Sequence, residues 1–298
     1  MKTDYSFIET LFSVIAGGSP LAALEGTPAL RTMSAHAALF GNRFGLDEIA
    51  DAIQHGNERV YGFAGFAANR DRIQELSIGL KASQHEWLPE VEHHAGFLFP
   101  QARLDMITVC PVVGYDIGIG TKGVVCVNLN TGIFLENVRE LVSLVIHETA
   151  HAAFEQASGP LLGIAGLGSN RAMRAFLDYY IQYEGYGLFA PAEYRSRHRL
   201  PDAGTPPQED YRVAEDVVLA RSLVREYQAL VSDLECPEGL PLETFFQRGF
   251  GPSRLPHRLG YAIVDAVNRA NSLRMVQAAV SLECTEFVER YLPLVRDW

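Results

Sequence analysis

Apolar residues recur every three or four positions through most of this sequence, which is the spacing of helices that bury one face. In the first third, such stretches are separated by Gly17–Pro20 and Gly41–Asn42, which are typical of turns. We expect helices over residues 7–15, 29–40 and 46–53, and one long amphipathic helix over 68–92. His85, His93 and His94 are expected at the surface, since adjacent residues on a helix point in different directions.

The pattern changes at the start of the second hundred residues. Residues 104–113 and 123–129 are rich in β-branched side chains, and Gly114, Gly118 and Gly120 lie between them. Two such runs joined by a glycine-containing turn predict a β-hairpin. The hairpin would lead directly into the helix that follows it.

The rest of the chain again has helical spacing. We expect helices over residues 141–156, 171–189, 211–234, 259–271 and 273–290. Residues 158–170 form a glycine-rich connection that lacks a dinucleotide-binding pattern. The polar, proline-rich residues 191–211 are expected as a long exposed loop or a break between lobes. The sequence therefore predicts an α+β fold that is mostly helical, with a small antiparallel sheet and helical N-terminal and C-terminal parts.

Composition and charge narrow the class of protein. The 298 residues are 48% hydrophobic and 20% charged, as in an ordinary globular protein. A formal net charge of −11 argues against nucleic acid or an anionic membrane as partner. No run reaches the ~18 apolar residues of a membrane span, and Glu9 interrupts the first apolar stretch, so no secretory signal is expected. The four cysteines lack C-x-x-C spacing and are expected as reduced thiols in a cytoplasmic protein.

The clearest chemical motif lies in LVSLVIHETAHAAFEQ, residues 141–156. His147 and His151 are four residues apart, so on a helix their imidazoles share one face. Two imidazoles in this arrangement can bind one metal ion, and Glu148 beside the first can take a proton from a water on that metal. His-Glu-x-x-His on a helix is the zincin motif. We therefore predict one Zn²⁺ per chain, held in part by these two histidines.

Catalytic zinc usually has three protein ligands, so a third is expected elsewhere in the chain. Glu155 is excluded by geometry, because eight helical residues place it about 12 Å along the axis from His147. Glu184 on the next predicted helix is the candidate, since its neighbours are apolar and a buried carboxylate favours a nearby cation. Gly185, directly after it, would let that helix approach another closely.

His147-Glu148-x-x-His151, followed by Glu184 on a later helix, resembles the gluzincin zinc metallopeptidases. The chain is also similar to a family of predicted zinc-dependent proteases in two places. These are Glu184-Gly185 followed by residues 188–190 (LFA), and the later segment 256–261. The resemblance covers residues 97–267 and implies a zinc hydrolase, a peptidase, with a zincin-like fold. In such folds an extended peptide pairs with an edge strand beside the cleft. Residues 124–130 are the candidate for this edge strand, and the alternative is that they form a core strand.

In this mechanism Glu148 is the general base, which takes a proton as water attacks the carbonyl and delivers it to the leaving amine. The developing oxyanion needs a further hydrogen-bond donor. The candidates are Tyr261, His257, Tyr180 and Arg254. The resemblance favours Tyr261 as this donor, and His257 is predicted as a further catalytic residue. Asp178 is a candidate to orient a ligating histidine.

The sequence is compatible with three functions. The first is a metallopeptidase acting on peptides, the second a zinc enzyme acting on a small amide-type metabolite, and the third a non-catalytic helical binding module. We expect an N-terminal helical region over residues 1–96, a zinc-binding catalytic core over 97–190 and a C-terminal helical lobe over 191–298, or one compact unit containing all three.

Overall fold

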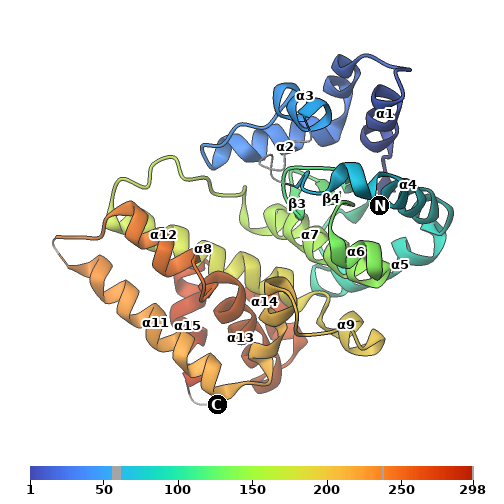
Figure 1. The fold of residues 1–298 in the computed structure, drawn as a ribbon. Helices are drawn as coiled ribbons and strands as arrows, with labels where there is room; N and C mark the ends of the chain where they lie inside the picture. Colours follow the sequence, from blue (N-terminus) through green and yellow to red (C-terminus); the bar gives the residue numbers. More distant parts are fainter. Residues whose placement is uncertain (56–61, 237, 297–298) are drawn as a thin grey trace. The chain divides into compact units, whose positions relative to one another are not determined.

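The computed structural model describes residues 1–55, 62–236 and 238–296. The chain forms two compact units (Figure 1). The first contains Met1–Phe97 and Gln101–Gln156, and the second contains Leu98–Pro100 and Ala157–Trp298. The described residues are mostly helical with one small sheet, which confirms the predicted mostly helical α+β class.

The sheet lies in the first unit and has the strand order β1–β2–β4–β3. Its strands are β1 (Lys2–Thr3), β2 (Thr108–Val112), β3 (Gly118–Thr121) and β4 (Val124–Asn128). Strands β1, β2 and β4 run parallel, and β3 runs antiparallel to β4. The sheet is therefore mixed, and the prediction of an antiparallel sheet is wrong. The hairpin joins β3 to β4, because Gly118 and Gly120, which we expected in a turn, form a strand.

Strand β4 is an interior strand, with β2 on one side and β3 on the other. Both of its edges are already paired, so of the two alternatives for residues 124–130 the edge strand is wrong and the core strand is confirmed, and a peptide cannot add there. The edge strand next to it is β3. Cys110 and Cys126 are direct neighbours in the β2–β4 register, and both are buried free thiols.

Helices surround this sheet in the first unit. They are α1 (Ser6–Ile15), α2 (Pro28–Leu39), α3 (Leu46–His55), α4 (Phe66–Ala82), α5 (Gln84–Leu98), α6 (Gly132–Glu136) and α7 (Val138–Ser158), with the 3-10 turns η1 (Leu21–Gly26) and η2 (Leu104–Met106). The three short helices predicted near the N-terminus are confirmed. The predicted long helix over residues 68–92 is two helices, α4 and α5. Ser83 follows the end of α4, and its hydroxyl donates to the Gly79 carbonyl over 2.9 Å. His94 is buried and 3.7 Å from Glu90, so its predicted surface position is wrong.

Helix α7 is buried around most of its circumference. From Glu140 to Phe154 nearly every side chain is buried, whereas the sequence pattern predicted a half-buried helix. A helix that is buried on nearly all sides normally carries apolar residues only. Polar side chains at such positions cost free energy unless they find partners. The burial of His147, Glu148 and His151 in α7 therefore requires a physical explanation.

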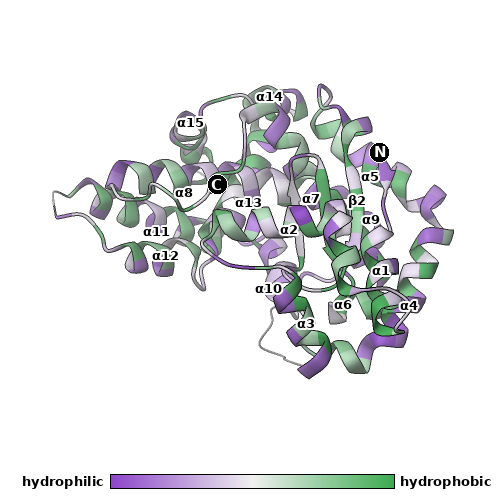
Figure 2. Ribbon diagram, turned by 90° about the horizontal axis from the view of Figure 1, so that it is seen from above, coloured by the Kyte–Doolittle hydropathy of each residue, from purple (hydrophilic) through white to green (hydrophobic). Residues whose placement is uncertain are grey.

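The second unit consists of helices. They are α8 (Asn170–Phe189), α9 (Ala192–His198), α10 (Pro206–Glu209), α11 (Val217–Glu235), α12 (Leu242–Phe250), α13 (Leu255–Ala270), α14 (Leu273–Ala279) and α15 (Cys284–Arg296), with the 3-10 turn η3 (Asp210–Ala214). The predicted loop over residues 191–211 is wrong, because α9, α10 and the start of η3 occupy it. The helix predicted from Tyr211 begins at Val217, where the Asp216 side chain accepts from the Leu219 N–H over 2.9 Å. Figure 2 shows hydrophilic and hydrophobic residues alternating along α11 and α12, as in other amphipathic helices.

Helix α8 packs along α13, and two glycines make this close approach possible (Figure 1). A Cβ atom on Gly185 would lie 2.5 Å from the Gly260 carbonyl oxygen, and one on Gly260 would lie 2.1 Å from the Ile181 carbonyl oxygen. Any larger residue would separate the two backbones. The close approach expected at Gly185 is therefore present, with α13 as the neighbouring helix.

Candidate metal centre

His147 and His151 converge within α7. Their Nε2 atoms are 2.8 Å apart, and the two rings are nearly perpendicular, with centroids separated by 4.4 Å. Both residues are buried, at 9% and 3% exposure. The four-residue spacing thus places both imidazoles on one face of a buried helix, as the sequence predicts.

The separation of the two nitrogens can be compared with that in a zinc site. Two nitrogens that bind one tetrahedral zinc at about 2.0–2.1 Å are roughly 3.3 Å apart. The observed 2.8 Å differs from this by about half an ångström, which small ring rotations can supply. The spacing of the histidine pair is therefore compatible with binding of one metal ion.

Glu148 lies beside the pair and against the edge strand of the sheet. Its Oε1 atom is 4.0 Å from His147 Nε2, and the residue is 5% exposed. A Cβ atom on Gly118 in β3 would stand 2.8 Å from that same Oε1. The carboxylate can occupy its place because residue 118 has no side chain. The Glu148 carboxylate is therefore close enough to the histidine pair to act as a base beside it.

Two glycines in β3 allow the strand to approach helix α7 closely, which was not predicted from the sequence. Gly118 and Gly120 are two residues apart, so in a strand they face the same side of the sheet. A Cβ atom on Gly120 would be 1.8 Å from the Glu148 carbonyl oxygen. The Gly-Ile-Gly spacing just before a zincin motif was a recognisable signal for close packing of a strand on a helix.

Glu184 and His257 meet in the second unit. Glu184 projects from α8, and its Oε2 atom is 3.4 Å from His257 Nε2 in the first turn of α13. The two side chains are 12% and 26% exposed. His257, predicted as a catalytic donor, thus contacts the predicted third ligand directly. The sequence did not indicate this pairing.

Among the described residues, His147, His151 and Glu184 have side chains whose chemistry suits a metal ion. Each residue offers one ligand atom, an imidazole nitrogen from each histidine in the first unit and a carboxylate oxygen from Glu184 in the second. Two imidazole nitrogens and one carboxylate oxygen are a donor set typical of catalytic zinc. Such a group could hold a metal ion, and it contains the three residues that the sequence analysis selected.

Tyr261 lies one turn further along α13 than His257. It is 7% exposed, and its ring packs edge-on against Tyr211 with centroids 5.7 Å apart. Burial, and to a smaller extent the charge of Asp265, raise the pKa of the Tyr261 hydroxyl above its ordinary value. The hydroxyl is therefore protonated at neutral pH and can act only as a neutral donor or acceptor.

The other two candidate donors are already engaged. The Tyr180 hydroxyl donates to the Leu162 carbonyl over 2.7 Å. Arg254 donates from Nε to both oxygens of Asp210, over 3.0 and 2.8 Å. Asp210 is fully buried and also accepts from Arg258 over 2.8 Å. These contacts anchor η3 to the start of α13, which is a structural role.

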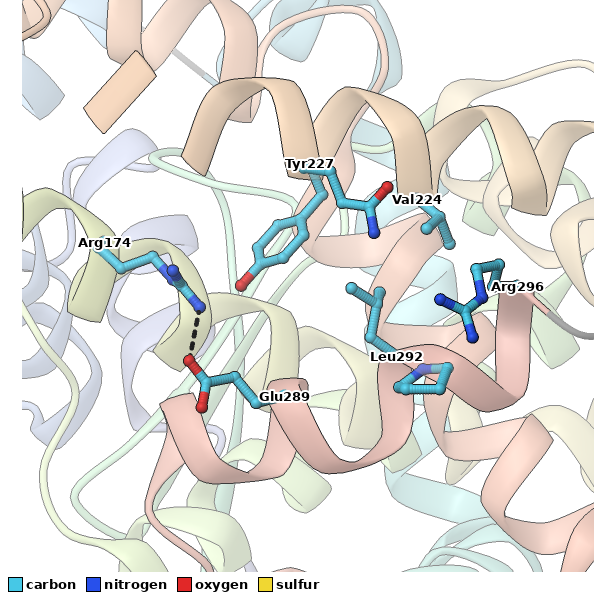
Figure 3. A pocket seen from close by; sticks show the side chains of 8 residues that line it. Arg174, Val224, Tyr227, Glu289, Leu292 and Arg296 are labelled. Atoms are coloured by element: carbon cyan, nitrogen blue, oxygen red, sulfur yellow. Dashed lines mark hydrogen bonds and ion pairs between the residues drawn. The ribbon is translucent and has the colours of Figure 1, made fainter. Parts of the chain in front are cut away.

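Asp178 belongs to a separate network on the other side of α8. Its carboxylate accepts from Arg174 Nε and from the Tyr227 hydroxyl, each over 2.7 Å. Arg174 also lies 3.3 Å from Glu289 in α15, at one end of a hollow of about 250 Å³ (Figure 3). Asp178 thus joins α8 to α11 and, through Arg174, to α15. Its two oxygens serve this network, whereas we had expected them to orient a histidine.

No protein-family model, curated protein or solved structure matches this chain. Within the described residues, none of the helices combines the length and the apolar content needed to cross a bilayer. The functional argument therefore depends on the geometry of the residues themselves.

Proposed function

We propose that this protein is a zinc-dependent hydrolase, specifically a metallopeptidase that cleaves peptide bonds. The observation that supports this most strongly is the pair of buried imidazoles in α7, whose Nε2 atoms are 2.8 Å apart with Glu148 beside them. His147, Glu148 and His151 are ionisable residues in a mostly buried helix, where they cost stability, and a bound cation with a catalytic base would explain their presence.

In this proposal His147, His151 and Glu184 hold one Zn²⁺ per chain. The ligand set of two nitrogens and one oxygen leaves room for water or substrate, which distinguishes a catalytic zinc from a structural one. When bound, zinc would polarise the scissile carbonyl and acidify a water molecule. A closed set of four protein ligands would not permit this chemistry.

Glu148 acts as the general base. Its carboxylate takes one proton from the attacking water, whose oxygen forms the new bond to the carbonyl carbon. The same carboxyl group then delivers that proton to the amine nitrogen as the carbon–nitrogen bond breaks. The carboxylate lies 4.0 Å from His147 Nε2, in space that is open because Gly118 has no side chain.

His257 and Tyr261 have supporting roles in α13. His257 orients the Glu184 carboxylate, which it approaches to 3.4 Å. Tyr261 is the proposed donor to the developing oxyanion, since its raised pKa keeps the hydroxyl protonated. The substrate is a peptide or a small amide. A cytoplasmic location fits the cysteines, all four of which are free even where Cys110 faces Cys126.

A digest of a peptide library by the zinc-loaded protein tests the proposal. We compare wild type with Glu148→Gln, which keeps the size of the side chain but removes its basicity. The matched control is Glu75→Gln, on the exposed face of α4. We expect cleavage by wild type and by the control, and a rate at least about 10²-fold lower for Glu148→Gln.

The alternatives give different results in the same digest. A zinc-loaded protein that cleaves no peptide but hydrolyses small amides would replace the peptidase with a small-molecule hydrolase. Equal peptide cleavage by wild type and Glu148→Gln would refute the role of the general base. Removal of the metal with a chelator must abolish all activity that we attribute to this site.

A further inference from the structure

The first unit contains a hollow whose lining differs in charge from the rest of the protein. It lies between α2 and the turn that joins β3 to β4, with a volume of about 240 Å³. Its polar lining consists of Arg31, Thr32 and His36 from α2 and of Thr121 and Lys122 from the turn. It shares no residue with the candidate metal centre.

The charge of this hollow is opposite in sign to that of the whole chain. Arg31 and Lys122 carry positive charges, and none of the described residues that line it is acidic. The chain as a whole has a formal net charge of −11. Arg31 uses one N–H to reach the Gly26 carbonyl over 2.9 Å, which leaves further donors on the same guanidinium. A local excess of positive charge in an acidic protein attracts small anions.

One residue at this hollow has a backbone conformation that is unfavourable for residues with side chains. Lys122 has φ 50°, and Gly123, the second residue of the two-residue turn between β3 and β4, has φ 74°. A two-residue hairpin turn favours positive φ at both positions, so the turn sets this conformation. The Lys122 N–H is held by the Glu155 carboxylate over 3.0 Å. The turn thus presents a lysine side chain where glycine would be the easier choice.

The remaining lining indicates what else the ligand contains. Leu39 and Val124 form an apolar side of the hollow. Thr121 is 3% exposed, and its hydroxyl lies next to the Glu155 carboxylate. The volume is below the roughly 300–1,000 Å³ of pockets for drug-sized ligands, so the ligand is smaller than these.

We propose that this hollow binds a small organic anion, a carboxylate or a phosphate ester that carries a short apolar group. Arg31 and Lys122 pair with the anionic group. Leu39 and Val124 cover the apolar group. The Glu155 carboxylate bonds to the Lys122 backbone and is not part of the lining.

Calorimetric titration with three probes tests this site. Butyrate and butyl phosphate carry the proposed chemistry with different anionic groups, and butylammonium has the same apolar group with the opposite charge. We expect saturable one-to-one binding of at least one anion, and the anion that binds more tightly identifies the preferred group. Butylammonium should not bind.

The variant Arg31→Gln/Lys122→Gln should weaken binding of the anion by at least about tenfold. The control Arg43→Gln/Lys81→Gln removes the same charge from exposed positions of the same unit and should change the affinity less than about twofold. In wild type, the amide NMR shifts induced by the bound anion should be largest at Thr121 and Lys122, a result that does not depend on any variant. Absence of saturable binding by either anion, equal weakening in the control, or shifts located elsewhere would overturn the proposal.

Discussion

Gly120 in β3 lies directly against the backbone of Glu148 in α7. A Cβ atom on Gly120 would be only 1.8 Å from the Glu148 carbonyl oxygen, which is far inside any allowed contact. The strand and the helix can approach this closely because residue 120 has no side chain. The position of the proposed general base is thus fixed by a glycine that lies 28 residues earlier in the chain.

Replacement of Gly120 by alanine should destabilise the first unit. The new methyl group meets backbone rather than a flexible side chain, so the strand and the helix must move apart. We expect a loss of about 1–3 kcal/mol in the free energy of unfolding, measured by urea denaturation. Gly132→Ala is the control, because nothing lies within 4 Å of its Cβ position. A stability equal to that of wild type would show that this packing is looser than described.

Gly118→Ala should act on the reaction rather than on the fold. Its Cβ atom would approach Glu148 Oε1 to 2.8 Å, and that carboxylate can move because it ends a flexible side chain. We expect kcat for peptide hydrolysis to fall by about 10²-fold, with the zinc content unchanged, because a displaced base transfers its proton poorly. Gly26→Ala, at a position with no atom within 4 Å, is the control. Unchanged kcat would mean that Glu148 is not the base.

The contact of His257 with Glu184 predicts an effect on metal affinity. Groups that orient a metal ligand typically contribute 10- to 100-fold to affinity. His257→Phe should therefore weaken zinc binding by at least about tenfold, and His257→Gln, which can still donate to the carboxylate, should restore part of it. Competition with a chelating dye measures both variants. Unchanged affinity with reduced kcat would make His257 a catalytic donor instead.

Asp178 predicts a specific dependence of stability on pH. Burial raises its pKa above the ordinary value of 3.8, although bonds from Tyr227 and Arg174 act in the opposite direction. A carboxyl group with a raised pKa in the folded state contributes stability that is present below its unfolded pKa and lost as the pH rises through the folded pKa. The free energy of unfolding of wild type minus that of Asp178→Asn should therefore decrease from about pH 4 upward and then level off.

Urea denaturation at a series of pH values measures this difference. Asp202→Asn, at an exposed position, should give a difference that does not vary with pH over the same range. A difference between wild type and Asp178→Asn that increases with pH would show that the pKa of Asp178 is lowered, so that its two hydrogen bonds outweigh its burial.

The parts of this structure that could be predicted from sequence depend on local spacing. Helices α7 and α8 were found because apolar residues repeat within them, and His147 and His151 share a face for the same reason. Glu184 could be selected because its neighbours are apolar. The ends of these helices differ from the predicted ends by three residues or fewer.

The parts that were missed depend on contacts between distant residues. The parallel pairing of β2 with β4 places β3 at the edge, and neither strand pattern nor glycine content specifies that order. The pairing of His257 with Glu184 arises because Gly185 and Gly260 bring α8 and α13 together. The hollow between α2 and the β3–β4 turn contains a left-handed lysine that no propensity predicts.

The zinc content of the purified protein tests the central claim most directly. Mass spectrometry of wild type after loading with zinc and removal of excess metal should give one zinc per chain. Glu148→Gln should retain this value, while His147→Ala and Glu184→Gln should each lose most of the metal, because two of three ligands hold zinc poorly. Wild type that contains no stoichiometric zinc after loading would contradict the account, as would full zinc retention in Glu184→Gln.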